Sequence, residues 1–98
     1  MTTQQFPLDR FAEARARIRH AVHKTPLMGS KALSKWIGVP VYFKCENLQK
    51  TGSFKVRGAL HKVTQLTQEE RAKGVATISA GNHAQAVAWA AASVEVPC

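Results

Sequence analysis

Helical and extended segments alternate along this chain, and the alternation limits its fold more than any other feature of the sequence. Apolar residues recur at helical spacing in four segments, and two shorter segments between them have the composition of strands. The predicted helices are residues 8–22, 31–37, 54–66 and 82–92, and the predicted strands are residues 41–45 and 75–79. Alternation of this kind builds parallel sheets with helices on their faces. The sequence therefore predicts an α/β fold with an open parallel sheet.

Capping residues mark the ends of these helices. Asp9 and Ser30 are suitable N-caps for the first two helices, and Thr67 with Glu70 forms a capping-box pattern that begins a further short helix. Trp36 and Trp89 fall on or beside apolar faces, so both are predicted to lie in the core.

The predicted sheet is incomplete within the 98 residues. Residues 94–98 have the pattern of a third strand that is just beginning, and an unpaired strand leaves backbone donors and acceptors without partners. We therefore expect the chain to be the N-terminal part of a longer protein, inactive by itself.

The charge of the chain indicates an anionic partner. Fourteen Lys and Arg residues against six Asp and Glu residues give a formal net charge of +8. Nucleic acid, an acidic membrane and a phosphorylated small molecule all fit this charge. The run of Arg15, Arg17, Arg19 and Lys24 alternates around its helix without interleaved aromatic residues, so it is predicted to be a solvated face and not a nucleic-acid site.

The sequence gives little support for a membrane span, a disulfide framework or a metal site. The longest apolar run, residues 86–92, is too short to span a bilayer, so no membrane partner is expected. Two cysteines are too few for a disulfide framework, which favours a cytoplasmic location. His20 and His23 have no acidic or cysteine neighbour, so no metal site is predicted.

One candidate site is the segment at residues 47–59, where a loop meets the start of a helix. Ser53 is placed to cap this helix, so Lys55 lies in its first turn at the positive end of the helix dipole. The dipole and the like charges of Lys50 and Arg57 favour the neutral amine, which can condense with a carbonyl group. Judged by position alone, a solvated lysine without a specific role is the more common alternative.

A second candidate site is the junction at residues 79–85. The small residues Ala80 and Gly81 leave the backbone accessible, and the N–H groups at the helix start can bind a carboxylate or phosphate. The alternative is that Asn82 only caps the helix and that His83 is an ordinary first-turn residue.

Together these segments resemble the fold type II family of pyridoxal 5'-phosphate enzymes, most closely its threonine/serine dehydratase and serine racemase branch. The resemblance runs through residues 25–27, 43–49, 51–59 and 79–85. It implies the tryptophan synthase beta-like architecture of two domains with open parallel sheets. Residues 1–72 would then begin the large cofactor-binding domain with the lysine loop, and residues 73–98 would begin the small domain with the carboxylate loop.

The resemblance also implies roles for individual residues. Lys55 would be the Schiff-base lysine and the base that removes the alpha proton, Phe54 would pack beside the cofactor ring, and Asn82 would bind the 3'-oxygen. The carboxylate loop would be Ser79, Ala80, Gly81, Asn82 and His83. In the racemases the position of Ala80 is a serine that donates the second proton, so elimination is expected to dominate here.

The implied activity is an ammonia-lyase reaction on threonine, serine or 3-hydroxyaspartate that gives a 2-oxo acid and ammonia, in an enzyme that is a homo-oligomer at full length. The family's glycine-rich phosphate loop and its partner for the pyridine nitrogen belong to later sequence. Racemase-type activity and a non-catalytic basic fragment remain the alternatives.

Overall fold

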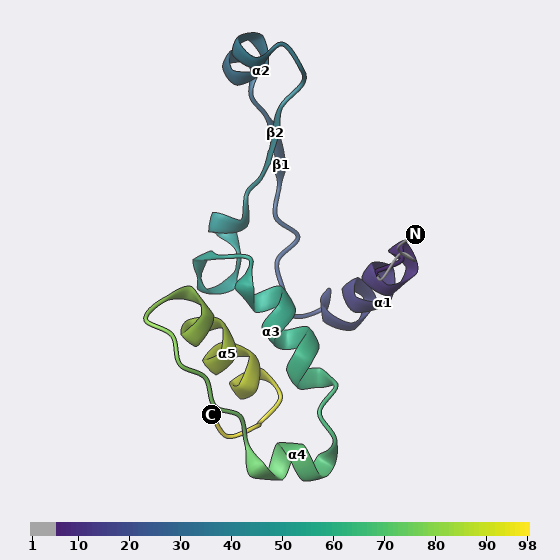
Figure 1. Ribbon diagram of the computed structural model, residues 1–98, viewed down its shortest axis with the longest axis vertical. Coiled ribbons are helices and arrows are strands. Elements are labelled where there is room, and N and C mark those ends of the chain that lie inside the picture. The colour runs from purple at the N-terminus through teal and green to yellow at the C-terminus, as the bar shows by residue number, and fades with distance from the viewer. Residues whose placement is uncertain (1–5) are drawn as a thin grey trace, which may run out of the picture.

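Two helices lie side by side at the centre of the structure: α3 (Lys55–Thr64) and α5 (Asn82–Ser93). The computed structural model describes residues 6–98. Val56 on α3 and Ala86 on α5 are fully buried, and both helices run in the same direction (Figure 1). Alanine at the buried positions of α5 leaves little side chain between the helices, so their backbones approach closely.

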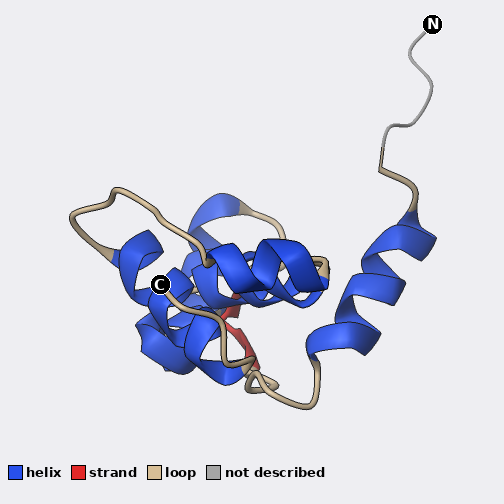
Figure 2. Ribbon diagram, turned by 90° about the horizontal axis from the view of Figure 1, so that it is seen from below, coloured by secondary structure: helices blue, strands red, loops and turns tan. Residues whose placement is uncertain are grey.

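The remaining elements surround this helix pair. They are α1 (Leu8–Ile18), β1 (Leu27–Gly29), α2 (Lys31–Ile37), β2 (Tyr42–Lys44), the 3-10 turns η1 (Glu46–Leu48) and η2 (Lys50–Gly52), and α4 (Gln68–Lys73). Helix α1 stands to one side and contacts α3 (Figure 2). The core cluster joins α1, α3 and α5 through Ile18, Leu60, Val63 and Ala90.

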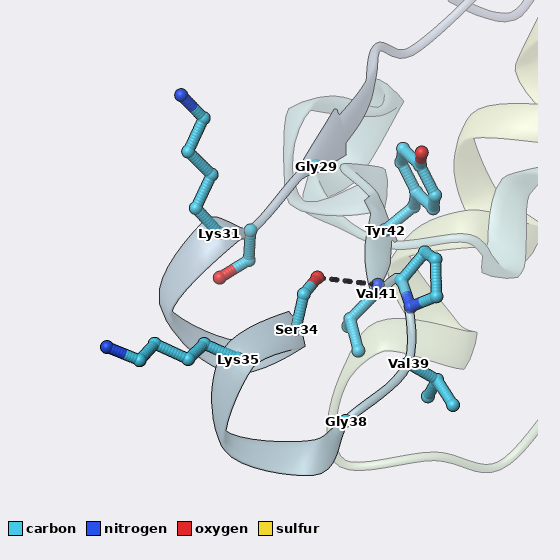
Figure 3. Close-up of a pocket in the computed structure, with 10 residues that line it drawn as sticks. Gly29, Lys31, Ser34, Lys35, Gly38, Val39, Val41 and Tyr42 are labelled. Carbon is cyan, nitrogen blue, oxygen red and sulfur yellow. Dashed lines mark hydrogen bonds between the residues drawn. The ribbon is translucent and has the colours of Figure 1, made fainter.

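Strands β1 and β2 form an arm that carries α2 away from the helix pair (Figure 1). The predicted strand 41–45 is confirmed as β2, but its partner is antiparallel, with Met28 opposite Phe43. Ser30 caps α2 by accepting a hydrogen bond from the backbone N–H of Leu33 at 3.2 Å, as predicted. The Ser34 hydroxyl accepts a hydrogen bond from the Val41 N–H at 2.8 Å, which fixes α2 against the arm (Figure 3).

The predicted strand 75–79 is wrong as a paired strand. The segment is extended, but its one backbone hydrogen bond to the C-terminal residues runs from the Val75 N–H to the Pro97 carbonyl, at 2.8 Å. Residues 94–98 likewise form no strand, and the Val94 N–H bonds back to the end of α5. A strand is defined by its neighbour's hydrogen bonds, and in residues 6–98 this neighbour is missing.

The helices agree with the sequence predictions more closely than the strands do. Helix α3 buries Val56, Leu60 and Val63 on one face, and Thr67 and Glu70 form the predicted capping box of α4. Helix α1 ends at Ile18, one turn before the predicted end at residue 22, and the predicted Asp9 cap is wrong because the helix begins before it.

Large apolar side chains on the arm and the loops remain exposed. The prediction that Trp36 lies in the core is wrong, because its side chain is 84% exposed, whereas Trp89 packs against the core cluster. The other strongly exposed apolar residues include Leu27, Met28, Tyr42, Phe43 and Ile78. Exposed apolar surface on this scale marks a region that binds something else.

The 98-residue chain alone is therefore expected to bind a hydrophobic dye and to unfold over a broad temperature range, because too little of its apolar surface is buried. Dye fluorescence and a thermal melt followed by circular dichroism measure this, with the guanidinium-unfolded chain as the reference. A sharp cooperative melt without dye binding would contradict it.

Candidate active site

The lysine loop, residues 46–54, makes two 3-10 turns before α3 begins. Thr51 adopts a left-handed conformation with φ of 58°, which is unusual for a β-branched residue, and Gly52 follows with φ of 77°. The Thr51 hydroxyl is buried and has no hydrogen-bond partner among the described residues. Such strain costs about 1–3 kcal/mol and persists only where the surroundings hold it.

Gln49 holds this loop in place. Its side chain is buried, accepts a hydrogen bond from the His23 N–H at 2.9 Å and donates one to the His23 carbonyl at 2.8 Å. The same amide oxygen accepts a hydrogen bond from the Lys50 N–H at 2.9 Å. One glutamine therefore joins the loop to the segment that follows α1.

Glu46 forms a second group of contacts that hold the loop. Its carboxylate accepts two hydrogen bonds from the Arg57 guanidinium, one of them at 3.0 Å, and a third from the hydroxyl of the buried Thr25. The Arg57 hydrogen bond, supported by Thr25, lowers the pKa of Glu46 to about 2, and Glu46 in turn raises the pKa of Arg57. The charge of Arg57, expected from sequence to act on Lys55, is thus paired with Glu46.

Lys55 is the first residue of α3, and its side chain is exposed. The prediction that Ser53 caps α3 is wrong, because the N-cap residue is Phe54 and it is preceded by Ser53, whose hydroxyl accepts only a long hydrogen bond from the Lys55 N–H at 3.4 Å. The Lys55 amine lies 5.1 Å from the centroid of the Phe54 ring. Among the described residues the ion pairs are Arg57–Glu46 and Lys73–Glu69, so the Lys55 amine has no carboxylate partner.

The second loop, residues 79–83, is exposed throughout. The Gly81 N–H donates a hydrogen bond to the Ser79 hydroxyl at 3.2 Å, which shapes the turn into α5. The N-cap residue of α5 is Gly81 and no side chain in the described part of the chain caps this helix, so the interpretation of Asn82 as a mere cap is wrong. The N–H groups of Asn82 and His83 are therefore open to an external acceptor.

The two loops lie at the same end of the helix pair. Helices α3 and α5 run in the same direction, and η2, which leads into α3, packs against α5 (Figure 1). One end thus presents a primary amine beside an aromatic ring together with an uncapped helix N-terminus. These groups fit a carbonyl-bearing cofactor and an anionic substrate group. The depression beside α2, lined by Gly29, Ser34 and Tyr42, contains none of these groups (Figure 3).

Comparison with known proteins decides the family. A family model described as pyridoxal-phosphate dependent enzyme matches residues 18–98. The chain belongs to this family. Membership confirms the predicted family and its cofactor, pyridoxal phosphate.

Individual relatives agree with this assignment. The chain is 52% identical over 91 residues to an L-threonine ammonia-lyase of Geobacter sulfurreducens, covering 93% of this chain and 23% of that protein. It is 49% identical over 86 residues to a serine racemase of Dictyostelium discoideum, covering 87% of this chain and 26% of that protein.

A crystal structure of serine racemase from Dictyostelium discoideum superposes with a TM-score of 0.89 at 45% identity, over 97% of this chain and 31% of that one. This likeness confirms the predicted fold type II class. The chain spans about a quarter of the length of the curated relatives it matches. Within residues 6–98, no helix has both the length and the apolar character needed to cross a bilayer.

Glu46 and Gln49 hold the lysine loop in place, and the sequence analysis gave neither residue a role. Both lie inside a segment that carries the family resemblance, but their partners are 26 residues away in the case of Gln49 and His23, and 21 in the case of Glu46 and Thr25. Patterns among neighbouring residues cannot reveal contacts between residues so far apart in the sequence.

The Glu46–Arg57 pair predicts how stability depends on pH. Because folding lowers the pKa of Glu46 from 4.5 to about 2, its contribution is complete at neutral pH and is lost as the pH falls through this interval. Glu46→Gln should destabilise the full-length enzyme by about 1–3 kcal/mol at neutral pH and flatten the acid limb of its stability curve. Urea unfolding at several pH values measures this.

Glu69→Gln is the matched control, since Glu69 pairs with Lys73 on the exposed face of α4. This control should change stability by less than about 0.5 kcal/mol. Equal effects of the two substitutions would contradict a specific role for Glu46.

Proposed function

We propose that this chain is the N-terminal part of an ammonia-lyase that uses pyridoxal phosphate to convert a beta-hydroxy amino acid into a 2-oxo acid and ammonia. The observation that carries the proposal is the unpaired Lys55 amine at the same end of the helix pair as the uncapped start of α5. The name of the Geobacter relative, an L-threonine ammonia-lyase, supports the reaction class. Threonine, serine and 3-hydroxyaspartate are the candidate substrates.

In this proposal Lys55 holds the cofactor and later moves a proton. Its amine would hold the cofactor, and its Nζ would accept the alpha proton of the substrate. The Phe54 ring, 5.1 Å from this amine, packs beside the cofactor, and the Asn82 amide binds its 3'-oxygen. Pyridoxal phosphate supplies an electron sink for the carbon that loses the proton.

The loop at residues 79–83 orients the substrate. Its carboxylate binds at the start of α5, where open backbone N–H groups and the helix dipole favour a negative charge. Ser79 shapes the turn through its bond to the Gly81 N–H, and Ala80 and Gly81 leave room for close approach of the substrate. His83 lies in the first turn of α5 beside Asn82.

We further propose that residues 1–72 belong to the large domain, that residues 73–98 begin the small domain, and that the full-length enzyme is a cytoplasmic homo-oligomer. The change of direction at Gly74, with φ of 79° after α4, supports a boundary there.

Racemase-type activity is the second candidate, since several relatives are named serine racemases. Racemisation by two bases needs a proton donor on the face of the cofactor opposite Lys55. The residue before Gly81 is Ala80, whose methyl group has no exchangeable proton. This residue favours elimination over racemisation.

Sodium borohydride should fix the cofactor covalently on Lys55 in the full-length enzyme, because the exposed amine is placed to hold it. Peptide mapping locates the modified residue. Lys55→Ala should abolish this labelling and lower kcat by at least about 10²–10⁴-fold, whereas Lys62→Ala, on the same helix, should leave both unchanged. Labelling of Lys50 or Lys62 in the unmodified enzyme would contradict the assignment.

Ala80→Ser should raise racemisation relative to elimination, because it adds a hydroxyl where the second proton is needed. The full-length enzyme is incubated with L-serine, the 2-oxo acid is quantified, and the remaining serine is resolved by chiral chromatography. Ala88→Ser, on the exposed face of α5, is the control and should leave the ratio unchanged. Rapid formation of D-serine by the unmodified enzyme would show that another group donates this proton.

A further inference from the structure

A basic cleft lies where the end of α1 and the segment after it face β2 and α3. Of residues 6–98, seven basic side chains and two apolar side chains line it, and no acidic side chain does. The lining residues are Arg15, Ile18, Arg19, His20, Val22, His23, Lys24, Lys44 and Arg57. Its volume is about 730 Å³, which is within the range of small-molecule sites.

The structure changes the interpretation of the basic run in α1. Arg15 and Arg19 are four residues apart, so they lie on one face of the helix, and both line the cleft. Arg10 and Arg17 belong to the same segment but do not line it. Arg15 and Arg19 are exposed, as the sequence predicts for a solvated face, and the structure adds that both line one cleft.

Most of the charge in this cleft is not neutralised within the described residues. Arg57 is paired with Glu46, and the Lys44 amine donates a hydrogen bond to the Thr25 carbonyl at 2.6 Å. Arg15, Arg19 and Lys24 form no ion pair in residues 6–98. Like charges in one concave site repel one another and produce a positive electrostatic potential there. A bound anion is attracted by this potential and reduces the repulsion between the basic groups.

We propose that this cleft binds a small anion that carries two or more phosphate charges. Two guanidinium groups one helical turn apart can each make paired hydrogen bonds to phosphate oxygens, and Lys24 and Lys44 add point charges from other elements. Lys55 and residues 79–83 are not among the lining residues, so the cleft is separate from the proposed active site.

The lining favours a small anion over a nucleic acid. Among the described residues, no Phe, Tyr or Trp lines the cleft, whose apolar wall consists of Ile18 and Val22, so it lacks the large aromatic rings on which single-stranded nucleic acids usually stack their bases. The volume of about 730 Å³ also suits a compact ligand better than an extended strand.

Titration calorimetry on the full-length enzyme, at constant ionic strength, tests the proposal with inorganic pyrophosphate as the probe. Fructose 1,6-bisphosphate in a second arm distinguishes an inorganic from an organic source of the two phosphate charges. We expect saturable binding with one site per chain. The variant Arg15→Gln/Arg19→Gln should weaken it at least about tenfold, because it removes both guanidinium groups.

Arg10→Gln/Arg17→Gln is the matched control, since it removes the same charge from the same helix outside the cleft. It should change the affinity less than about twofold. Equal weakening by the two double variants would overturn the proposal in favour of diffuse attraction to net charge. Absence of saturable binding of both probes would also overturn it, as would binding of a single-stranded oligonucleotide alone. Because the readout is binding and not turnover, failure here leaves the proposed lyase reaction untouched.

Discussion

The ion pair between Glu46 and Arg57 is the interaction on which the arrangement of this chain depends. It joins the end of β2 to the first turn of α3, and the hydroxyl of Thr25 ties the segment before β1 to the same carboxylate. Three parts of the chain that are distant in sequence therefore meet at one group. The start of α3, and with it Lys55, is fixed relative to the arm and to the segment that follows α1.

The second constraint is the close pairing of α3 and α5. Buried alanines on α5 let the two helices pack tightly, and because they run in the same direction, both N-termini lie at one end. Helix N-termini favour negative charge, so this end suits an anionic substrate that must meet a lysine amine. The packing that forms the core thus brings the lysine loop and residues 79–83 to the same end of the helix pair.

The sequence predicted what depends on neighbouring residues. The caps of α2 and α4, the buried face of α3 and the first-turn position of Lys55 all follow from spacing along the chain. The strand predicted at residues 75–79 does not form, because a strand needs a hydrogen-bonded partner. Residues 94–98 supply only one backbone hydrogen bond to this segment, from the Val75 N–H to the Pro97 carbonyl. The basic cleft could not be predicted for a related reason, since Arg15 and Arg19 border a concave surface only once Lys44 and Arg57 face them.

Lys55 and the start of α5 are proposed to lie on two sides of a single site. A crystal structure of the full-length enzyme with pyridoxal phosphate and a substrate-like carboxylate tests it most directly. Our account predicts continuous electron density from Lys55 Nζ to the cofactor, with the carboxylate on the backbone N–H groups at the start of α5. Cofactor attached to a different lysine, or a carboxylate bound away from residues 79–83, would contradict it.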